Sequence, residues 1–132
     1  MKFFLVILLF CITIEASQTV LFDTLEWQDN KRSKSLKKTW KEAKQYCSLL
    51  SLNGKDDWRL PTVKELQNIV NIRRKKPAID DSFKYTATKN YWSSTIYQNN
   101  HKKAWSVQFY RGYTRNNVKT KKYRNEMFIT SL

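Results

Sequence analysis

Few side chains in this sequence could do chemistry, and their spacing assembles no known catalytic set. The carboxylate pairs Asp56-Asp57 and Asp80-Asp81 could hold a hard cation or act as acid and base, but neither has the spacing of a calcium loop. Adjacent aspartates in loops more often accept hydrogen bonds from the backbone, so we interpret both pairs as structural. His101 is the only histidine, in a polar stretch typical of an exposed loop.

The cysteine and glycine content offers little else for catalysis or cofactor binding. Cys47 is the only cysteine after residue 16, and its place on the apolar side of an expected helix favours a buried thiol. An intermolecular disulfide is the alternative. With Gly54 and Gly112 as the only glycines, there is no glycine-rich phosphate loop. No Cys/His zinc cluster or Ser-His-Asp set can be assembled, so we expect no catalytic residue, metal or cofactor.

The strongest functional signal in this sequence is its excess of positive charge, which suits the binding of anions. The formal net charge is +14. Residues 17–81 hold fourteen Lys/Arg and nine Asp/Glu, whereas residues 82–132 hold ten Lys/Arg and one acid. Cations neutralise sulfate, carboxylate or phosphate, and aromatic side chains among them stack on sugar rings or bases. The alternative is an ordinary solvated surface in a lysine-rich sequence, but the scarcity of acids after residue 81 argues against it.

Two basic clusters supply the candidate binding residues, one at an expected helix end and one on and after an expected hairpin. The candidate ligand-binding residues are Arg73, Arg74, Lys75, Lys76, Arg111, Tyr113, Arg115, Lys119, Lys121, Lys122 and Arg124. We expect them to recognise an acidic polysaccharide or another anionic cell-surface component. An accessory subunit that docks an acidic protein partner is the alternative, and the export expected below argues against nucleic acid.

The N-terminus has the layout of a secretory signal. A basic start is followed by an apolar run too short to span a bilayer and by small residues at Ala16-Ser17. We predict a signal peptide over residues 1–16 and a single domain over residues 17–132, with no transmembrane segment after cleavage. The protein is then exported, to the periplasm, the cell surface or the medium.

Two capped helices and several strands are expected to position these residues. Thr39 with Glu42 and Thr62 with Glu65 have the spacing of capping boxes. Apolar residues at helical spacing behind them predict helices over 40–52, with Asn53-Gly54 as the stop, and over 63–71. Later segments rich in β-branched and aromatic residues predict strands. The expected strands cover residues 20–27, as one strand or a hairpin, and residues 91–97, 104–110, 113–119 and 126–130. Helices followed by strands indicate an α+β fold.

Several aromatic and polar residues are interpreted as architectural. In 104–110, Trp105, Val107 and Phe109 alternate with polar residues, which predicts that all three share a buried face. We expect Arg59 to pair with a buried acid or carbonyl, with a bidentate contact to a ligand as the alternative, and Ser93 and Ser94 to bond the backbone in a turn. The residues expected to be structural are Trp40, Trp58, Arg59, Pro61, Trp92, Ser93, Ser94 and Trp105.

The ordered segments TWKEAKQYC, DDWRLPTVKEL, IDDSF, NYWSST and AWSVQFYRG resemble the C-terminal domain of the Legionella collagen-like protein. The resemblance covers about residues 20–130 and implies a C-type-lectin-like fold, related to formylglycine-generating enzymes, with two helices packed on a twisted antiparallel sheet. It also implies a binding or adhesion module, with acidic glycans as one ligand class.

The sequence departs from that family in two ways. Its end, Glu126 to Leu132, lacks the Arg-Cys-Val-Arg-like strand whose cysteine could pair with Cys47. The calcium-binding triplets of sugar-binding C-type lectins are also absent, so calcium-dependent sugar binding is not expected.

Overall fold

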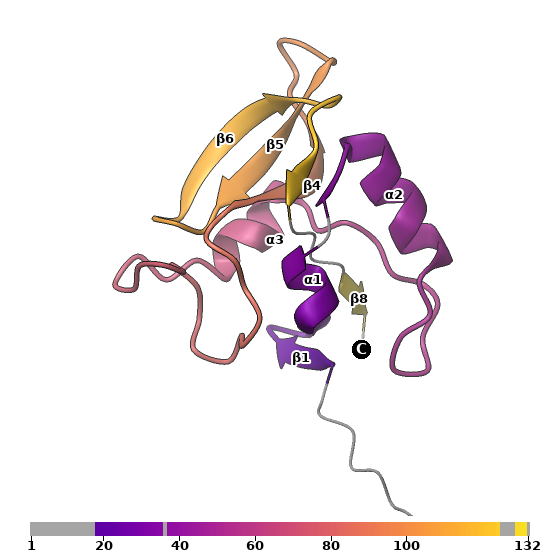
Figure 1. Cartoon of the computed structure of the whole chain (residues 1–132), viewed down its shortest axis with the longest axis vertical. Helices are drawn as coiled ribbons and strands as arrows, with labels where there is room; N and C mark the ends of the chain where they lie inside the picture. Colours follow the sequence, from indigo (N-terminus) through magenta and orange to yellow (C-terminus); the bar gives the residue numbers. More distant parts are fainter. Residues whose placement is uncertain (1–17, 36, 125–128, 132) are drawn as a thin grey trace, which may run out of the picture.

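The structure, a computed structural model, describes residues 18–35, 37–124 and 129–131 and has an α+β architecture with antiparallel sheets (Figure 1). The helices in these ranges are α1 (Lys31–Ser35), α2 (Trp40–Leu49) and α3 (Val63–Asn68). One sheet has the order β1-β2-β8, a second pairs β3 with β7, and the third has the order β4-β5-β6. The strands are β1 (Thr19–Phe22), β2 (Leu25–Gln28), β3 (Lys37–Lys38), β4 (Asn90–Ile96), β5 (Lys103–Gln108), β6 (Tyr113–Val118), β7 (Tyr123–Arg124) and β8 (Ile129–Ser131).

The α+β class predicted from the sequence is confirmed, with two differences in detail. The antiparallel strands form three small sheets, and α1 lies in a stretch for which no helix was predicted. α1 forms because Asn30 caps it. The Asn30 side-chain oxygen accepts from the Ser33 backbone nitrogen at 2.9 Å, and the buried Ser33 hydroxyl donates to the Asn30 carbonyl oxygen at 2.7 Å.

The central strands β4 and β5 carry buried residues on both faces. Because successive side chains of a strand point to opposite faces, Tyr91 and Trp92 enter two different cores. The first core contains Trp27, Leu66, Ile69, Ile79, Phe83, Tyr91, Val107, Phe109 and Ile129. The second contains Ala43, Cys47, Trp58, Leu60, Trp92 and Ala104, with Trp40 and Tyr46 packed against it.

Both longer helices begin at the predicted capping boxes but end earlier than predicted. In α2, Thr39 Oγ1 accepts from the Glu42 backbone nitrogen at 3.2 Å, and the Glu42 carboxylate accepts from the Thr39 backbone nitrogen at 3.1 Å. α2 ends at Leu49, since Leu50 is already extended with ψ at 125°, and α3 ends at Asn68. The predicted ends at residues 52 and 71 were therefore wrong.

Asn53 and Gly54 form a turn of their own beyond the helix. Both have positive φ, at 52° and 74°, and the flanking Leu52 and Lys55 exchange backbone hydrogen bonds of 3.0 and 3.1 Å. An Asn-Gly pair favours this two-residue turn because both residues tolerate left-handed conformations. The expectation that the pair stops the helix directly was therefore wrong.

The WRLP segment links the second core to α3. Trp58 is buried, and its indole nitrogen donates to the Lys55 carbonyl oxygen at 3.1 Å. Arg59 donates to both carboxylate oxygens of Glu65, at 2.9 and 3.0 Å. The Pro61 carbonyl oxygen accepts from the Ser94 backbone nitrogen at 2.8 Å, which attaches the entry of α3 to β4.

Ser93 and Ser94 do not lie in a turn, although a turn was predicted for them. They lie within β4, at a bulge between Trp92 and Ile96. Ser93 is buried, and its hydroxyl donates to the Trp105 carbonyl oxygen at 2.7 Å.

Trp105 is only half-buried, while its neighbours Ala104 and Ser106 are fully buried. The reason is that β5 has a core on each side, so simple alternation assigns its faces incorrectly. The Trp105 ring instead packs edge-on against Tyr97, with ring centroids 5.1 Å apart.

The predicted signal peptide, residues 1–16, lies outside the described residues. Within the described ranges, none of the helices has the length and apolar character needed to cross a membrane.

The Arg59–Glu65 pair predicts an acid-dependent part of the folding stability. The Arg59 hydrogen bonds hold the pKa of Glu65 below its ordinary value of 4.5. A lowered folded-state pKa contributes stability above about pH 4.5 that is lost as the pH falls through that lowered pKa. Glutamine keeps the capping hydrogen bond but not the charge, so Glu65→Gln should destabilise the protein at pH 7 by about 0.5 kcal/mol, the contribution of a partly exposed ion pair, and much less at pH 3.

Urea unfolding of both proteins at the two pH values measures this difference. Glu42→Gln is the matched control, because Glu42 caps α2 in the same way and has no arginine among its hydrogen-bond partners. A stability difference for Glu65→Gln that stays constant from pH 7 to pH 3 would contradict the assignment.

Candidate anion-binding site

The first basic cluster lies on a loop that is attached to the turn after β5. Residues 73–76 are all exposed and follow α3 at a distance of several residues, so they are not at a helix end as expected. The Lys76 backbone nitrogen donates to the Tyr110 carbonyl oxygen at 3.2 Å, and the Ala78 nitrogen donates to the Phe109 carbonyl oxygen at 2.7 Å. Two segments more than thirty residues apart are therefore joined at this point.

Tyr110 is the residue around which these two segments place their charges. The Lys76 ammonium lies 5.1 Å and the Arg111 guanidinium 5.7 Å from the centre of its ring. Cations at this distance from an aromatic face are attracted by its electrons. The Lys76 hydrogen bond, together with the charges of Lys76, Arg111 and Lys75, lowers the pKa of the Tyr110 hydroxyl. The structure thus brings Arg111 to the Arg73–Lys76 run.

Gly112 allows the turn to approach the loop closely. Its φ is +85°, and a Cβ atom built at this position would lie 2.5 Å from Cγ1 of Val70. A side chain at this position would collide with the Val70 side chain, which packs against the first core, so either Val70 or the turn would have to shift. Gly112 therefore fixes the distance between the turn and the loop that carries the basic run.

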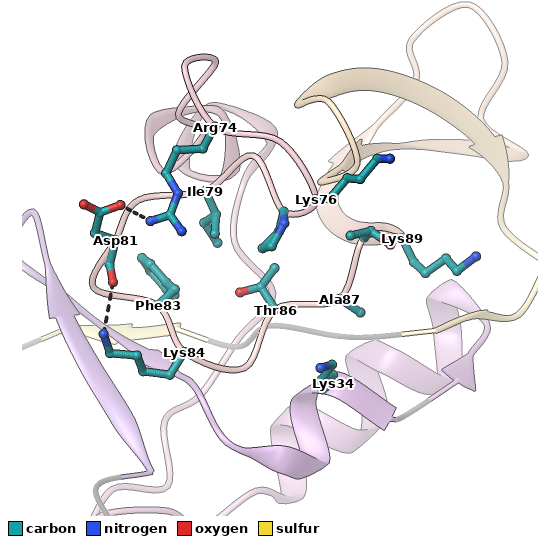
Figure 2. A pocket seen from close by; sticks show the side chains of 12 residues that line it. Lys34, Arg74, Lys76, Ile79, Asp81, Phe83, Lys84, Thr86, Ala87 and Lys89 are labelled. Atoms are coloured by element: carbon teal, nitrogen blue, oxygen red, sulfur yellow. Dashed lines mark hydrogen bonds and ion pairs between the residues drawn. The ribbon is translucent and has the colours of Figure 1, made fainter.

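Next to this loop lies a cavity of about 910 Å³ with a strongly cationic lining (Figure 2). Its charged lining residues are Lys34, Arg74, Lys76, Lys84, Lys89 and Asp81, five cations and one acid. Figure 2 shows them around the cavity, with Lys34 rising from α1 and the others on the loops between α3 and β4. This volume is in the range of pockets for small ligands.

Buried groups hold the cavity wall in place. The buried Asp29 carboxylate, which follows β2, accepts from the backbone nitrogens of Lys84 and Tyr85, both at 2.8 Å. The Ala87 nitrogen donates to the Tyr91 hydroxyl at 2.9 Å, and burial raises the pKa of Tyr91, which keeps this hydroxyl neutral. The wall that carries Lys84 and Lys89 is therefore fixed from both β2 and β4.

The floor of the cavity combines apolar groups with one unpartnered hydroxyl. Pro77, Ile79, Phe83 and Ala87 supply the apolar part. Thr86 is 7% exposed, and its Oγ1 is buried with no hydrogen-bond partner among the described residues. A buried hydroxyl without a partner costs free energy, so its retention in a cavity lining is unusual.

The Asp80-Asp81 pair divides between two roles. Asp80 accepts from the backbone and the hydroxyl of Ser82, and these bonds lower its pKa, which fits the structural interpretation. The Asp81 side chain is 82% exposed and forms an ion pair with Arg74 at the cavity rim. In the sequence Asp81 was interpreted as structural, but it contributes the single acid of the cavity lining.

The second basic cluster lies at the other end of β6 and surrounds Trp40. Lys119 and Lys44 place their ammonium groups 4.2 and 4.5 Å from the centre of the Trp40 ring. The Trp40 indole nitrogen donates to the Ser93 carbonyl oxygen at 2.9 Å, which fixes the ring. Lys121 and Lys122 are exposed just beyond Lys119.

Three other candidate residues complete the picture along β6 and β7. Tyr113 and Arg115 are exposed on β6, between the two clusters. The backbone of Arg124 pairs with Lys37, but its side chain lies outside the described part of the chain. The predicted second cluster is therefore divided, since Arg111 joins residues 73–76 and Lys119 joins Trp40.

Sequence reasoning missed three of the five cations of the cavity, Lys34, Lys84 and Lys89. Lys84 and Lys89 are isolated in the sequence, so no run of charge marks them, whereas Lys34 lies in the basic segment 31–38, which was not singled out as a candidate site. The available signal was Asp29, a lone acid after a strand that could have been expected to bind backbone nitrogens of another segment.

Residues with other chemistry lie apart from this cavity. Cys47 is buried in the second core, where its thiol donates to the Lys44 carbonyl oxygen at 3.1 Å, and His101 is exposed in the turn before β5. Among the residues that the structure describes, no three His, Cys, Asp or Glu side chains form a group suited to a metal ion.

The fold and the cavity define a small α+β domain with a cationic cavity. A sequence model of the Lcl C-terminal domain matches residues 21–127, and the chain belongs to this family, which confirms the resemblance seen in the sequence. Among solved structures, the chain is similar to rhodocetin, a snake C-type-lectin-like protein, with 13% identity and a TM-score of 0.48. That match covers 89% of this chain and 97% of rhodocetin. No curated protein sequence matches the chain.

The close approach at Gly112 predicts a position-specific cost for a methyl group. Gly112→Ala should destabilise the protein by about 2 kcal/mol or more, because it adds an overlap with Val70 to the strain of positive φ. Gly54→Ala is the matched control, with φ of +74° and no atom within 4 Å of the added Cβ. Its cost should be about 1 kcal/mol, from backbone strain alone. Thermal and urea unfolding measure both, and equal losses would refute the close contact.

The surroundings of Tyr110 predict a titration shift. Lys76→Gln removes the largest cause of the lowered Tyr110 pKa, so that pKa should rise toward its ordinary value of 10.0. Lys102→Gln removes the same charge from an exposed position that does not contribute to this shift, and should leave it unchanged. NMR titration of ring-labelled tyrosine resolves Tyr110 from the other six tyrosines. An unchanged Tyr110 pKa in Lys76→Gln would show that the ammonium group does not lie on this ring.

Proposed function

We propose that this protein is an exported, non-catalytic binding module that recognises an acidic glycan or another anionic surface polymer through its basic face. The observation that carries the proposal is the cationic cavity beside the Arg73–Lys76 loop, where five cations face one acid. Like charges gathered around a cavity repel one another, and an anionic ligand relieves this repulsion.

The aromatic residues of this face support a glycan as the ligand. Tyr110 and Trp40 each have two cations on their rings, and Tyr113 is 51% exposed between them on β6. An exposed aromatic ring can stack on the C–H face of a sugar while neighbouring cations bind its sulfate or carboxylate groups. The C-type-lectin-like architecture implied by the family, and the signal-like N-terminus, agree with a binding role outside the cytoplasm.

Retention on heparin beads across a salt series tests the proposal. Lys34→Gln/Lys84→Gln/Lys89→Gln removes three charges from the cavity, and Lys41→Gln/Lys64→Gln/Lys102→Gln removes three exposed charges elsewhere. Since both variants have the same net charge, non-specific attraction weakens equally in the two. We expect the cavity variant to elute at clearly lower salt than the control variant.

Two results would count against this function. One is retention of the unmodified protein no stronger than that of an unrelated protein of equal isoelectric point. The other is identical elution of the two triple variants. Recovery of one acidic protein in stoichiometric amount, with no retention on any acidic polysaccharide, would instead support the accessory-subunit alternative.

A further inference from the structure

The cavity beside Arg74 has features that indicate a narrower ligand class than an anionic polymer. We propose that it binds a compact ligand with two or more phosphate or sulfate groups, such as a multiply phosphorylated or sulfated sugar. We further propose that Asp81 occupies Arg74 until this ligand displaces it. The inference rests on the proposed function in that both place the anion at the same cations.

The arrangement of the cations favours a compact ligand. They come from two segments: α1 carries Lys34, and the connection between α3 and β4 carries Arg74 and Lys76 in its first part and Lys84 and Lys89 in its last part. Figure 2 shows these residues on several sides of the cavity, with the ammonium ends of Lys76 and Lys89 extending outward at its rim. A polymer lying across a flat face contacts a stripe of cations, whereas a group that enters a cavity contacts cations on several sides.

The balance of charge favours a ligand with several negative charges. Four lysines and one arginine line the cavity, and Asp81 is the only acid among the lining residues. A single carboxylate would leave most of this charge uncompensated. Phosphate monoesters carry about two negative charges each, and lysine binds phosphate as a point charge without a fixed orientation.

The floor provides contacts for the uncharged part of such a ligand. Pro77, Ile79 and Phe83 offer apolar surface of the kind on which the C–H face of a sugar ring packs. Thr86 belongs to the same lining, and its unpartnered hydroxyl, which is buried in the absence of ligand, can donate one hydrogen bond to a ligand oxygen after its side chain rotates toward the cavity. Because it has no partner among the described residues, its hydrogen bond to a ligand would replace none within the protein.

Asp81 already occupies one cation of the cavity in the absence of ligand. Its carboxylate pairs with Arg74, and the Lys84 ammonium donates to the Asp81 carbonyl oxygen at 3.4 Å. Both partners of the ion pair are well exposed, with side-chain exposures of 45% and 82%. Exposed ion pairs contribute little to stability, so a ligand with higher charge can exchange with this carboxylate at small cost.

Calorimetric titration of the full chain at fixed salt tests the ligand class. The probes are fructose 1,6-bisphosphate and sucrose octasulfate. Glucose 6-phosphate, which carries one phosphate group, is the comparison. We expect both multiply substituted probes to bind at one site, at least about tenfold more tightly than glucose 6-phosphate, as one further charge-assisted contact implies. Equal affinity for all three probes, or no binding of either multiply substituted probe, would overturn the inference.

Titration against pH separates phosphate from sulfate as the preferred group. The second pKa of a phosphate monoester is about 6, so affinity for a phosphate ligand should rise from pH 5 to pH 7. Sulfate groups do not titrate in this range, so affinity for the octasulfate should stay constant. A sugar disulfate compared with fructose 1,6-bisphosphate at pH 7 has the same number of groups, so the tighter of these two ligands identifies the preferred source of the charge.

Two substitutions test the individual residues. Asp81→Asn should tighten binding about two- to fivefold, because the internal competitor for Arg74 is removed. Asp56→Asn makes the same change of charge at an exposed position outside the cavity lining, and should have a clearly smaller effect. Thr86→Val should weaken binding about threefold without lowering the melting temperature, since the hydroxyl has no partner among the described residues. Unchanged affinity in Asp81→Asn would overturn the inference that the ligand displaces Asp81 from Arg74.

Failure of this inference can be distinguished from failure of the proposed function. If heparin retention depends on Lys34, Lys84 and Lys89 but the small probes do not bind, the compact-ligand inference is wrong and the polymer function stands. The opposite outcome is that the small probes bind the unmodified protein but not Lys34→Gln/Lys84→Gln/Lys89→Gln, while heparin retention is no better than that of the control protein. In that case the compact-ligand inference stands and the polymer function is wrong.

Discussion

The burial of β4 and β5 on both faces is the constraint on which the rest of this structure depends. Tyr91 and Trp92 are neighbours in β4, and each is fully buried in a different core. Each large aromatic side chain stabilises the fold by about 2–3 kcal/mol on burial. Because one strand serves both cores, the segments packed on its two sides, α3 on one and α2 on the other, are placed relative to each other through β4.

Hydrogen bonds from β4 and to it also fix the positions of the surrounding segments. The Trp92 indole donates to the Lys38 carbonyl oxygen, and the Trp40 indole donates to the Ser93 carbonyl oxygen. The Tyr91 hydroxyl accepts from the Ala87 nitrogen at the cavity wall. The loops that carry the cations are thus attached to buried groups at their bases while their charged ends remain in solvent. This arrangement suits a binding site, since function commonly lies on loops held by a rigid scaffold.

The fold could be predicted from the sequence where the determinants are local. Both capping boxes lie within four residues, and the helices start at Trp40 and Val63 as predicted. The helix ends and the faces of β5 depend on tertiary contacts, and these were predicted less well. Trp105 illustrates this: the alternation in its strand is real, but a second core covers Ala104 and Ser106, which alternation alone assigns to solvent.

The candidate site was harder to predict because charges gather in space and not along the chain. The Arg73–Lys76 run was visible in the sequence, but its neighbour Lys84 arrives through hydrogen bonds to Asp29, 55 residues away. Arg111 and Lys119 seemed to belong together because they are close in sequence. They lie at opposite ends of β6, and the sequence contains no sign of which end each would join.

The separation of the two basic clusters has a consequence for the size of ligand that this face can bind. β6 has six residues, and at about 3.3 Å per residue its ends are about 20 Å apart. Tyr110 with its cations lies at one end and Trp40 with its cations at the other. A compact ligand contacts one cluster only, whereas a polymer longer than this distance reaches both. Its second contact is then intramolecular, which raises affinity without any new kind of interaction. In the proposed function, a compact anion is therefore bound by one cluster alone, and an extended polymer that reaches both clusters is bound more strongly.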